Sequence, residues 1–215
     1  MTEKSLQERR GLEKKFVFQN DAAARYIFFA LKNDVGGLEN CRLHFREAKI
    51  LLDIYYDKPE LAFTRRGNIY RYREERAGSD PVYIRTIKKR VLQEATYEYR
   101  KEEEYKEEKA PGVMEADGER LDRVVKIRTY RMIIDVLQNQ QNIAHIHCDQ
   151  SMALNTDGSV MRKFYEVELL DETDRDSSEA MTEFSEFFQN TFNLVPMSRS
   201  KIERALDMTI QKEED

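Results

Sequence analysis

Hydrophobic and polar residues alternate along most of this chain with the two-residue period of a β-strand, and the polar positions are mainly Arg, Lys and Glu. Turn-forming residues such as Gly67-Asn68 separate the segments, which is typical of antiparallel hairpins. The register of residues 126–136 stays open, because their sequence offers two alternating sets. The pattern predicts eight strands, at residues 12–18, 49–56, 69–75, 82–90, 96–105, 126–136, 142–151 and 162–170.

Apolar residues recur at helical spacing in a few other segments. One helix is expected over residues 21–31, with Asp21 as its cap, and another over Ser178–Phe192, whose apolar residues fall on one face. Residues 115–124 are also predicted to be helical, and residues 200–206 to form a last helical turn. Residues 61–66 are predicted to be a short strand or a turn.

Eight antiparallel strands are enough to close a barrel, which leaves no exposed sheet edge. We therefore predict an α+β fold that is mainly β, an eight-stranded antiparallel barrel or tunnel with a few peripheral helices. Residues 11–206 are expected to form this single domain, with a flexible N-terminus at residues 1–10 and a flexible tail at residues 207–215. The alternative is an open sheet with one wet face and one buried face.

Composition narrows the class of protein. The chain has 215 residues, 40% hydrophobic and 36% charged, which is enough for one packed core. A formal net charge of -5 argues against a general nucleic-acid binder, so DNA is not an expected partner. We find no signal-peptide core and no apolar run of ~18 residues, so no membrane contact is expected. Two cysteines are too few for a disulfide framework, and a cytoplasmic protein with reduced thiols is the simplest interpretation.

Charged side chains of both signs share one face of several predicted strands. A solvent-exposed sheet face would usually also carry Ser, Thr, Asn and Gln. Faces made almost only of Arg, Lys and Glu therefore favour a charged cavity over an open sheet. The charged residues that share a strand face are Glu13 and Lys15, Arg71 and Arg73, Arg100, Glu102 and Glu104, and Glu166 and Glu168.

Phosphate chemistry would explain such a cavity. Arginine forks match phosphate oxygens in pairs, and lysine adds a mobile charge. Carboxylates would repel a polyphosphate unless a divalent ion stands between them, and Mg²⁺ or Mn²⁺ bridges carboxylate and phosphate oxygens. The expected partner is therefore a triphosphate-containing small molecule with a bound metal. In a purely structural barrel, the same charges would only pair with one another.

The other motifs in the sequence say less about function. His145 and His147 alternate on one predicted strand, and an H-x-H pair can bind zinc. No cysteine or third histidine stands at suitable spacing, and Cys148 faces the other way, so lining or hydrogen-bonded histidines are the preferred interpretation. The sequence contains no G-x-G-x-x-G, Walker A or G-x-S-x-G motif, so a serine or cysteine nucleophile has no support.

Motifs in a fixed order run from about Leu12 to Leu206: LEKK, NIYRYREE, YIRTIKK, YRKEEEY, KIR, HIHCD, YEVELLD and SKIERAL. In this order they resemble the CYTH family of triphosphate tunnel metalloenzymes. The resemblance implies an eight-stranded antiparallel tunnel that binds triphosphate groups. Members hydrolyse inorganic triphosphate, thiamine triphosphate or RNA 5′-triphosphate ends, and others make cyclic AMP from ATP.

The resemblance also assigns roles to residues. It implies a metal site for Mg²⁺ or Mn²⁺, bases that hold the phosphates, and carboxylates that hold a second ion or position water. Asp149 also falls in one of the matching motifs. The expected catalytic residues are Lys15, Arg71, Arg73, Lys88, Arg100, Glu102 and Glu104, the expected substrate-binding residues are Lys126, Arg128 and Lys201, and the expected metal ligands are Glu13, Glu166 and Glu168.

One position departs from the family pattern. Gly11 stands where the E-x-E-x-K motif has its first Glu, normally a metal ligand. The loss would weaken one metal site, shift the metal preference, or mark a chain that binds without turnover. We favour a metal-dependent triphosphate hydrolase; an adenylate cyclase, a non-catalytic polyphosphate or nucleotide-binding module and a ligand-free structural barrel stay open. The exposed part of the C-terminal helix also offers a contact for a homodimer, which nothing in the sequence requires.

Overall fold

The structure, a computed structural model, describes residues 13–18, 20–35, 40–78, 80–93, 98–107, 113–116, 118–155, 157–171 and 178–206. The ends predicted to be flexible, residues 1–10 and 207–215, lie outside the described residues. The elements in chain order are β1 (Glu13–Val17), α1 (Asp21–Lys32), β2 (Arg42–Asp57), α2 (Ala62–Arg65), β3 (Ile69–Arg76), β4 (Val82–Gln93), β5 (Glu98–Glu107), β6 (Met114–Ala116), β7 (Glu119–Gln138), β8 (Gln141–Leu154), β9 (Val160–Asp171), α3 (Ser178–Phe192), β10 (Val195–Pro196) and α4 (Lys201–Ala205).

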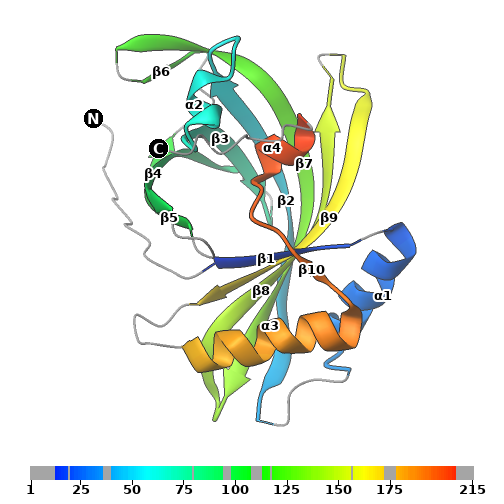
Figure 1. Ribbon diagram of the computed structural model, residues 1–215. Helices are drawn as coiled ribbons and strands as arrows, with labels where there is room; N and C mark the ends of the chain where they lie inside the picture. The colour runs from blue at the N-terminus through cyan, green and yellow to red at the C-terminus, as the bar shows by residue number, and fades with distance from the viewer. Residues whose placement is uncertain are drawn as a thin grey trace.

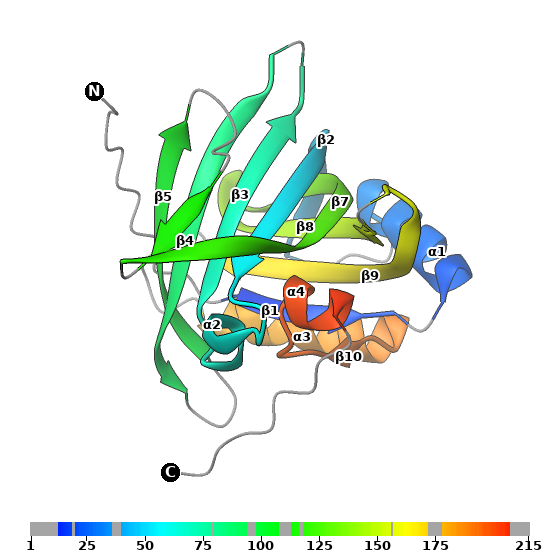
Figure 2. The same ribbon diagram turned by 90° about the horizontal axis from the view of Figure 1, so that it is seen from above.

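One antiparallel sheet forms most of the molecule, in the order β10-β1-β9-β8-β7-β2-β3-β4-β5, with β6 paired to β7 at the side. The mainly β fold with a few helices is confirmed, and the eight strands predicted from the alternation are β1 to β5 and β7 to β9. Among the described residues no pairing joins β5 to β1, so the sheet curves strongly without closing (Figure 2). The curvature gives the sheet an inner and an outer face.

The two long helices cover the outer face at one end of the sheet, in the lower half of Figure 1. The cap of α1 is Asn20 and not Asp21 as predicted, because the side chain of Asn20 accepts a hydrogen bond from the backbone N–H of Ala23 at 2.9 Å. Phe188 of α3 packs edge-on against Phe16 of β1, within a core that also contains Ile134 of β7. The predicted bounds of the Ser178–Phe192 helix are confirmed.

The short helices lie at the other end. Asp57 at the end of β2 is fully buried and accepts hydrogen bonds from the backbone N–H groups of Phe63 and Thr64, which holds α2 in place. The helix α4 packs Ile202 and Ala205 into a small core on the inner side of the strands. No helix in the described part of the chain is long and apolar enough to cross a membrane.

Three predictions of local structure are corrected. Residues 115–124 are not a helix but the β6–β7 hairpin, whose turn contains Gly118 at φ 78°. Residues 61–66 contain the short helix α2 instead of a strand or turn. The strand expected over residues 49–56 begins earlier, at Arg42.

Candidate active site

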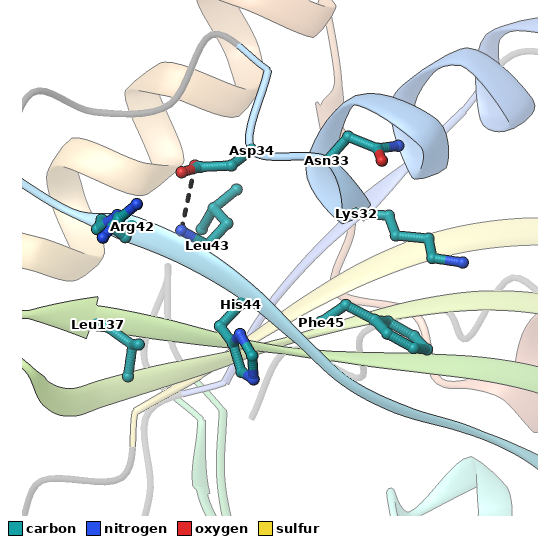
Figure 3. A pocket seen from close by; sticks show the side chains of 8 residues that line it. All are labelled: Lys32, Asn33, Asp34, Arg42, Leu43, His44, Phe45 and Leu137. Atoms are coloured by element: carbon teal, nitrogen blue, oxygen red, sulfur yellow. Dashed lines mark hydrogen bonds between the residues drawn. The ribbon is translucent and has the colours of Figure 1, made fainter.

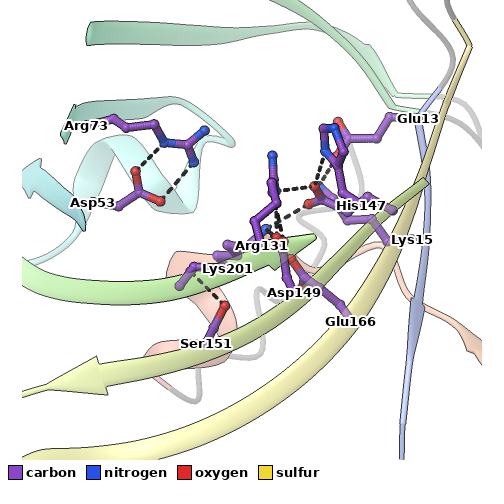
Figure 4. Close-up of polar contacts among 12 residues, drawn as sticks. Glu13, Lys15, Asp53, Arg73, Arg131, His147, Asp149, Ser151, Glu166 and Lys201 are labelled. Carbon is purple, nitrogen blue, oxygen red and sulfur yellow. Dashed lines mark hydrogen bonds and ion pairs between the residues drawn. The ribbon is translucent and has the colours of Figure 1, made fainter. Parts of the chain in front are cut away.

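Charged side chains from β1, β2, β3, β4, β5, β7, β8, β9 and α4 gather on the inner face of the sheet. Figure 4 shows those from β1, β2, β3, β7, β8, β9 and α4. Two groups can be distinguished. We call Asp149, Glu166 and Glu168, with Arg131 and Lys201, the acidic wall. We call Asp53, Arg71 and Arg73, with Thr86, the basic wall.

The acidic wall is built on the β8–β9 pair. Asp149 faces Glu166 across the two strands, and Glu168 follows two residues later on the same side of β9. All three carboxylates are buried, and each places an oxygen within 4.8 Å of the others. Three negative charges this close would be unstable without cations among them.

Lys201 supplies one of those cations. Its Nζ lies 2.9 Å from an oxygen of Asp149 and 2.8 Å from one of Glu168, and it also pairs with Glu166. Burial alone would lower the pKa of the Lys201 ammonium, but the three carboxylates outweigh burial and raise this pKa well above its ordinary value. The ammonium therefore stays charged inside the cluster.

The sequence around Lys201 explains its position. Ser200 is the N-cap of α4, and its side chain and that of Glu203 form a reciprocal capping box. Because Ile202 and Ala205 are held in the inner core, the first residue of the helix, Lys201, projects at the carboxylates. The structure thus places Lys201 within the carboxylate cluster, and its predicted role in substrate binding stays a prediction.

Arg131 of β7 supplies the second cation. Its Nε and one terminal nitrogen donate to the two oxygens of Asp149 at 2.7 and 2.5 Å, and that terminal nitrogen also donates to Glu168 at 2.7 Å. Burial would raise the pKa of Glu168, but Lys201 and Arg131 lower it well below its ordinary value. Burial, together with the neighbouring Glu168 and Asp149, raises the pKa of Glu166 in spite of Lys201 and of Arg204, which donates to Glu166 at 2.6 Å.

On the basic wall, Arg73 and Asp53 form a bidentate pair between β3 and β2. Arg73 donates to the two carboxylate oxygens at 2.6 and 2.9 Å, and Asp53 is fully buried. Burial would raise the pKa of Asp53, but Arg73 and Arg71 lower it to about 2. Figure 4 shows this pair set apart from the acidic wall. The pair satisfies both charges in a fixed geometry.

Arg71 is held less tightly. It donates to the hydroxyl of Thr86 at 2.9 Å, while Glu102 and Glu104 lie 3.9 Å away. Its Nε is buried and has no hydrogen-bond partner among the described residues. A buried guanidinium with an unused donor is costly unless a ligand completes it, so Arg71 is available to an anion.

Ammonium and carboxylate groups also approach each other between β1 and β4, across the interior. Lys15 pairs with Glu13 at 3.0 Å on β1, and Lys88 of β4 pairs with Glu102 of β5 at 2.8 Å. Burial acts to raise the pKa of Glu13, but Lys15 and then Lys88 more than offset this and lower it. The influence of Lys88 on Glu13 indicates that both face the same interior, although β1 and β4 are not paired.

The structure thus brings together most of the residues expected to form the site. Two expected residues lie elsewhere: Lys126 and Arg128 are exposed on the outer face of β7, so their predicted place in the tunnel is wrong. The inner face of β7 carries the other alternating set, which includes Thr129 and Arg131. The side chain of Arg100 lies outside the described part of the structure. The residues brought together are Glu13, Lys15, Arg71, Arg73, Lys88, Glu102, Glu104, Glu166, Glu168 and Lys201.

Sequence reasoning missed Arg131 and Asp53. Arg131 belongs to the second alternating set of β7, and only the pairing of Arg131 with Asp149 across the strands decides between the two sets. Asp53 interrupts the otherwise apolar run of β2, and a carboxylate in such a position needs a buried partner. That signal was present in the sequence.

The two histidines of β8 both line the interior, whereas Ile146 between them and Cys148 after them pack in the outer core. Burial and then Arg131 lower the pKa of His147 to about 4, so this imidazole is neutral at pH 7. Both histidine side chains lie on the inner face of β8, as their alternation in the sequence predicts.

A cavity of about 490 Å³ lies away from these residues, where the end of α1 meets β2 and β7 (Figure 3). Its lining includes Lys32, Arg42 and His44, and the backbone N–H of Leu43 donates to Asp34 at 3.1 Å. None of the residues expected to form the site lines this cavity.

Comparison with known proteins agrees with the fold. The model of the CYTH domain matches residues 25–205, so the chain belongs to the CYTH family. No curated protein matches this chain in sequence.

Several solved structures share the fold. The PH1819 protein of Pyrococcus horikoshii OT3 superposes with a TM-score of 0.62 and 19% identity, over 92% of this chain and 99% of that chain. A Hippeastrum protein, described as a candidate adenylyl cyclase with a dominant triphosphatase activity, gives 0.62 and 13% identity, over 92% and 96%. A candidate adenylate cyclase of Bacillus halodurans gives 0.58 and 15%, over 92% and 97%. At these identities the likeness concerns the fold.

Proposed function

We propose that this protein is a metal-dependent hydrolase of triphosphate groups, which acts on inorganic tripolyphosphate or on a nucleoside or other organic triphosphate. The observation that carries the proposal is the meeting, in one interior, of a buried carboxylate cluster and a separate group of arginine and lysine side chains. Family membership and the Hippeastrum neighbour support the same class of reaction.

The bases would bind the phosphate chain. Arg71 offers a buried donor without a partner among the described residues, and Lys88 and Lys15 lie on the same interior. Their positive charges would stabilise the negative charge that develops on the phosphate oxygens in the transition state. Arg73 is already saturated by Asp53, so its part would be to fix the wall on which Arg71 stands.

The carboxylates fit a divalent ion. Glu166 and Glu168, with Glu13, would hold Mg²⁺ or Mn²⁺, because hard divalent ions take carboxylate oxygens. Glu166 and Glu168 already lie with Asp149 in a cluster whose carboxylate oxygens are within 4.8 Å of one another. Bound there, the ion would neutralise phosphate charge and act as a Lewis acid. Glu102 and Glu104 would position the attacking water or hold a second ion. The protein would supply positioning and electrostatics, with no covalent intermediate.

The test is a turnover assay with Mg²⁺ or Mn²⁺ on tripolyphosphate and ATP, with product analysis. We expect phosphate release, and a loss of at least ~100-fold in Glu168→Gln with an unchanged circular-dichroism spectrum. Glu74→Gln is the control, since Glu74 belongs to an exposed pair with Arg76.

Each other result has a definite meaning. Unchanged turnover in Glu168→Gln would refute the metal assignment. Cyclic AMP and pyrophosphate from ATP would identify a cyclase, the alternative that the description of the Bacillus halodurans neighbour favours. Tight binding without product would identify a binding module.

The free and buried thiols of Cys41 and Cys148 suit the cytoplasmic location that forms part of this proposal.

A further inference from the structure

The two histidines on the inner face of β8 have different surroundings. The Nδ1 atom of His145 lies 2.9 Å from a carboxylate oxygen of Asp135, and Arg46 approaches the same ring at 3.2 Å. Asn142 also contacts the ring, so the polar atoms of His145 are accounted for.

His147 lies two residues further along, directly opposite Glu168 in the β8–β9 register. Its side chain is 12% exposed, and its Nδ1 is buried without a hydrogen-bond partner among the described residues. The nearest acceptor is the Oε2 atom of Glu168, at 3.6 Å. That separation is too long for a hydrogen bond. A buried nitrogen therefore faces a metal-ligand carboxylate with nothing joining the two.

The separation suits two ligands of one ion. Nitrogen and oxygen ligands bind divalent metals at about 2.0–2.2 Å, so two neighbouring ligands of the same ion lie about 3–4 Å apart. The 3.6 Å between His147 Nδ1 and Glu168 Oε2 falls inside this range. Lys201 contacts the other oxygen of Glu168, Oε1, whereas Oε2 accepts a hydrogen bond from Arg131 at 2.7 Å, so an ion bound between Oε2 and His147 would share this oxygen with Arg131.

We propose that His147 is a nitrogen ligand of the ion held by Glu168, and that it shifts the preference of the site from Mg²⁺ toward Mn²⁺ and later divalent transition metals. This inference rests on the proposed metal site. Imidazole binds transition metals well, whereas Mg²⁺ is held by oxygen ligands. A purely carboxylate site would lack this discrimination.

The direct test is pulsed electron paramagnetic resonance of bound Mn²⁺ without triphosphate, which detects a coordinated imidazole through its ¹⁴N modulation. The chain has 3 histidines, so the double variant His44→Gln/His145→Gln leaves His147 as the only one. We expect this variant to keep the imidazole signal, and ¹⁵N-histidine labelling to abolish its ¹⁴N component. This design leaves the site itself unchanged.

A second measurement uses calorimetric titration of Mn²⁺ and Mg²⁺. We expect His147→Gln to weaken Mn²⁺ binding by about 10–100-fold and Mg²⁺ binding by less than about threefold. His145→Gln is the matched control and should change neither. Bound Mn²⁺ with no ¹⁴N modulation in the double variant would overturn the inference and leave the hydrolase proposal standing. No Mn²⁺ binding at all would overturn both.

Discussion

The acidic and basic walls of the tunnel differ in the charged group that clusters there: three carboxylates, paired with Lys201, Arg131 and Arg204, on the first, and two arginines on the second. On the basic wall, Asp53 serves two guanidinium groups, Arg73 in a bidentate pair and Arg71 at 3.8 Å. On the acidic wall, three carboxylates cluster around Lys201. A metal–triphosphate complex carries a cation and anionic phosphates, so we expect its cation among the carboxylates of the acidic wall and its phosphates at the arginines of the basic wall.

The largest effect is expected from breaking the saturated pair of the basic wall. Asp53→Ala would leave the buried guanidinium of Arg73 without its bidentate partner, and we expect a loss of about 3–5 kcal/mol in the free energy of unfolding. Urea denaturation measures this loss. Glu74→Ala breaks the more exposed pair with Arg76 on the same strand and should cost less than about 1 kcal/mol. Equal costs would show that burial does not distinguish the two pairs.

Substitution of Arg71 should mainly affect activity toward the ligand, whereas substitution of Arg73 should mainly affect the stability of the fold. Arg71→Ala removes the guanidinium with the unused donor, and we expect kcat/KM for tripolyphosphate to fall about 10²–10³-fold while the fold persists. Arg73→Ala should mainly lower the unfolding free energy, because its donors to Asp53 are already used. Steady-state kinetics with a melting curve for each variant tests this division. The reverse pattern would exchange the roles of the two arginines.

Acid should weaken the basic wall in a defined window. The pKa of Asp53 is lowered from 3.8 to about 2, so its ionised form contributes about 2 kcal/mol to the free energy of unfolding. This contribution is complete above about pH 5 and is lost as the pH falls through about 2. Between about pH 6 and about pH 3, the unfolding free energy of Asp53→Asn should therefore fall by about 1 kcal/mol less than that of the wild type. Parallel acid profiles of the two proteins would refute this assignment.

The smallest effect is expected outside the tunnel. Lys126 and Arg128 are exposed on the outer face of β7, so the double variant Lys126→Ser/Arg128→Ser should change stability by less than about 0.5 kcal/mol and leave turnover unchanged. Phosphate-release assays and melting curves provide the comparison. A loss of turnover as large as that of Arg71→Ala would indicate that Lys126 and Arg128 face the tunnel, in contradiction to the structure.

The fold could be predicted where alternation is regular, and less well where both faces of a strand are covered. β7 shows why its register could not be read from the sequence. Its even-numbered side chains are exposed at 126 and 128 but are buried at Met132 and Ile134 beneath the helices. Each alternating set is therefore apolar along part of the strand, and only the neighbouring strands decide which set faces inward.

The β6–β7 hairpin was missed for a different reason. Glu115 to Val124 is rich in charged residues of moderate helix propensity, which suggested a helix. The pair Asp117-Gly118 is a typical hairpin signal, and Gly118 indeed adopts φ 78°, a conformation open to glycine. Local turn chemistry outweighed helix propensity here.

The candidate site was predictable in its residue types more than in its pairings. The alternating Glu166 and Glu168 indicated a carboxylate cluster. The S-x-x-E pattern at Ser200, which forms a capping box in the structure, is a further signal that would have placed Lys201 at a helix start. The division into saturated and available arginines depends on contacts between strands far apart in the sequence, such as Asp53 with Arg73, which no single segment encodes.

The central claim is that one interior holds the metal on the acidic wall and the phosphates on the basic wall. Crystals grown with Mn²⁺ and a non-hydrolysable triphosphate analogue test it directly through the anomalous signal of the ion. The account predicts a Mn²⁺ peak about 2.2 Å from carboxylate oxygens of Glu166 and Glu168, with phosphate oxygens on Arg71. A metal and analogue bound on the outer surface, with the inner ion pairs unchanged, would contradict it.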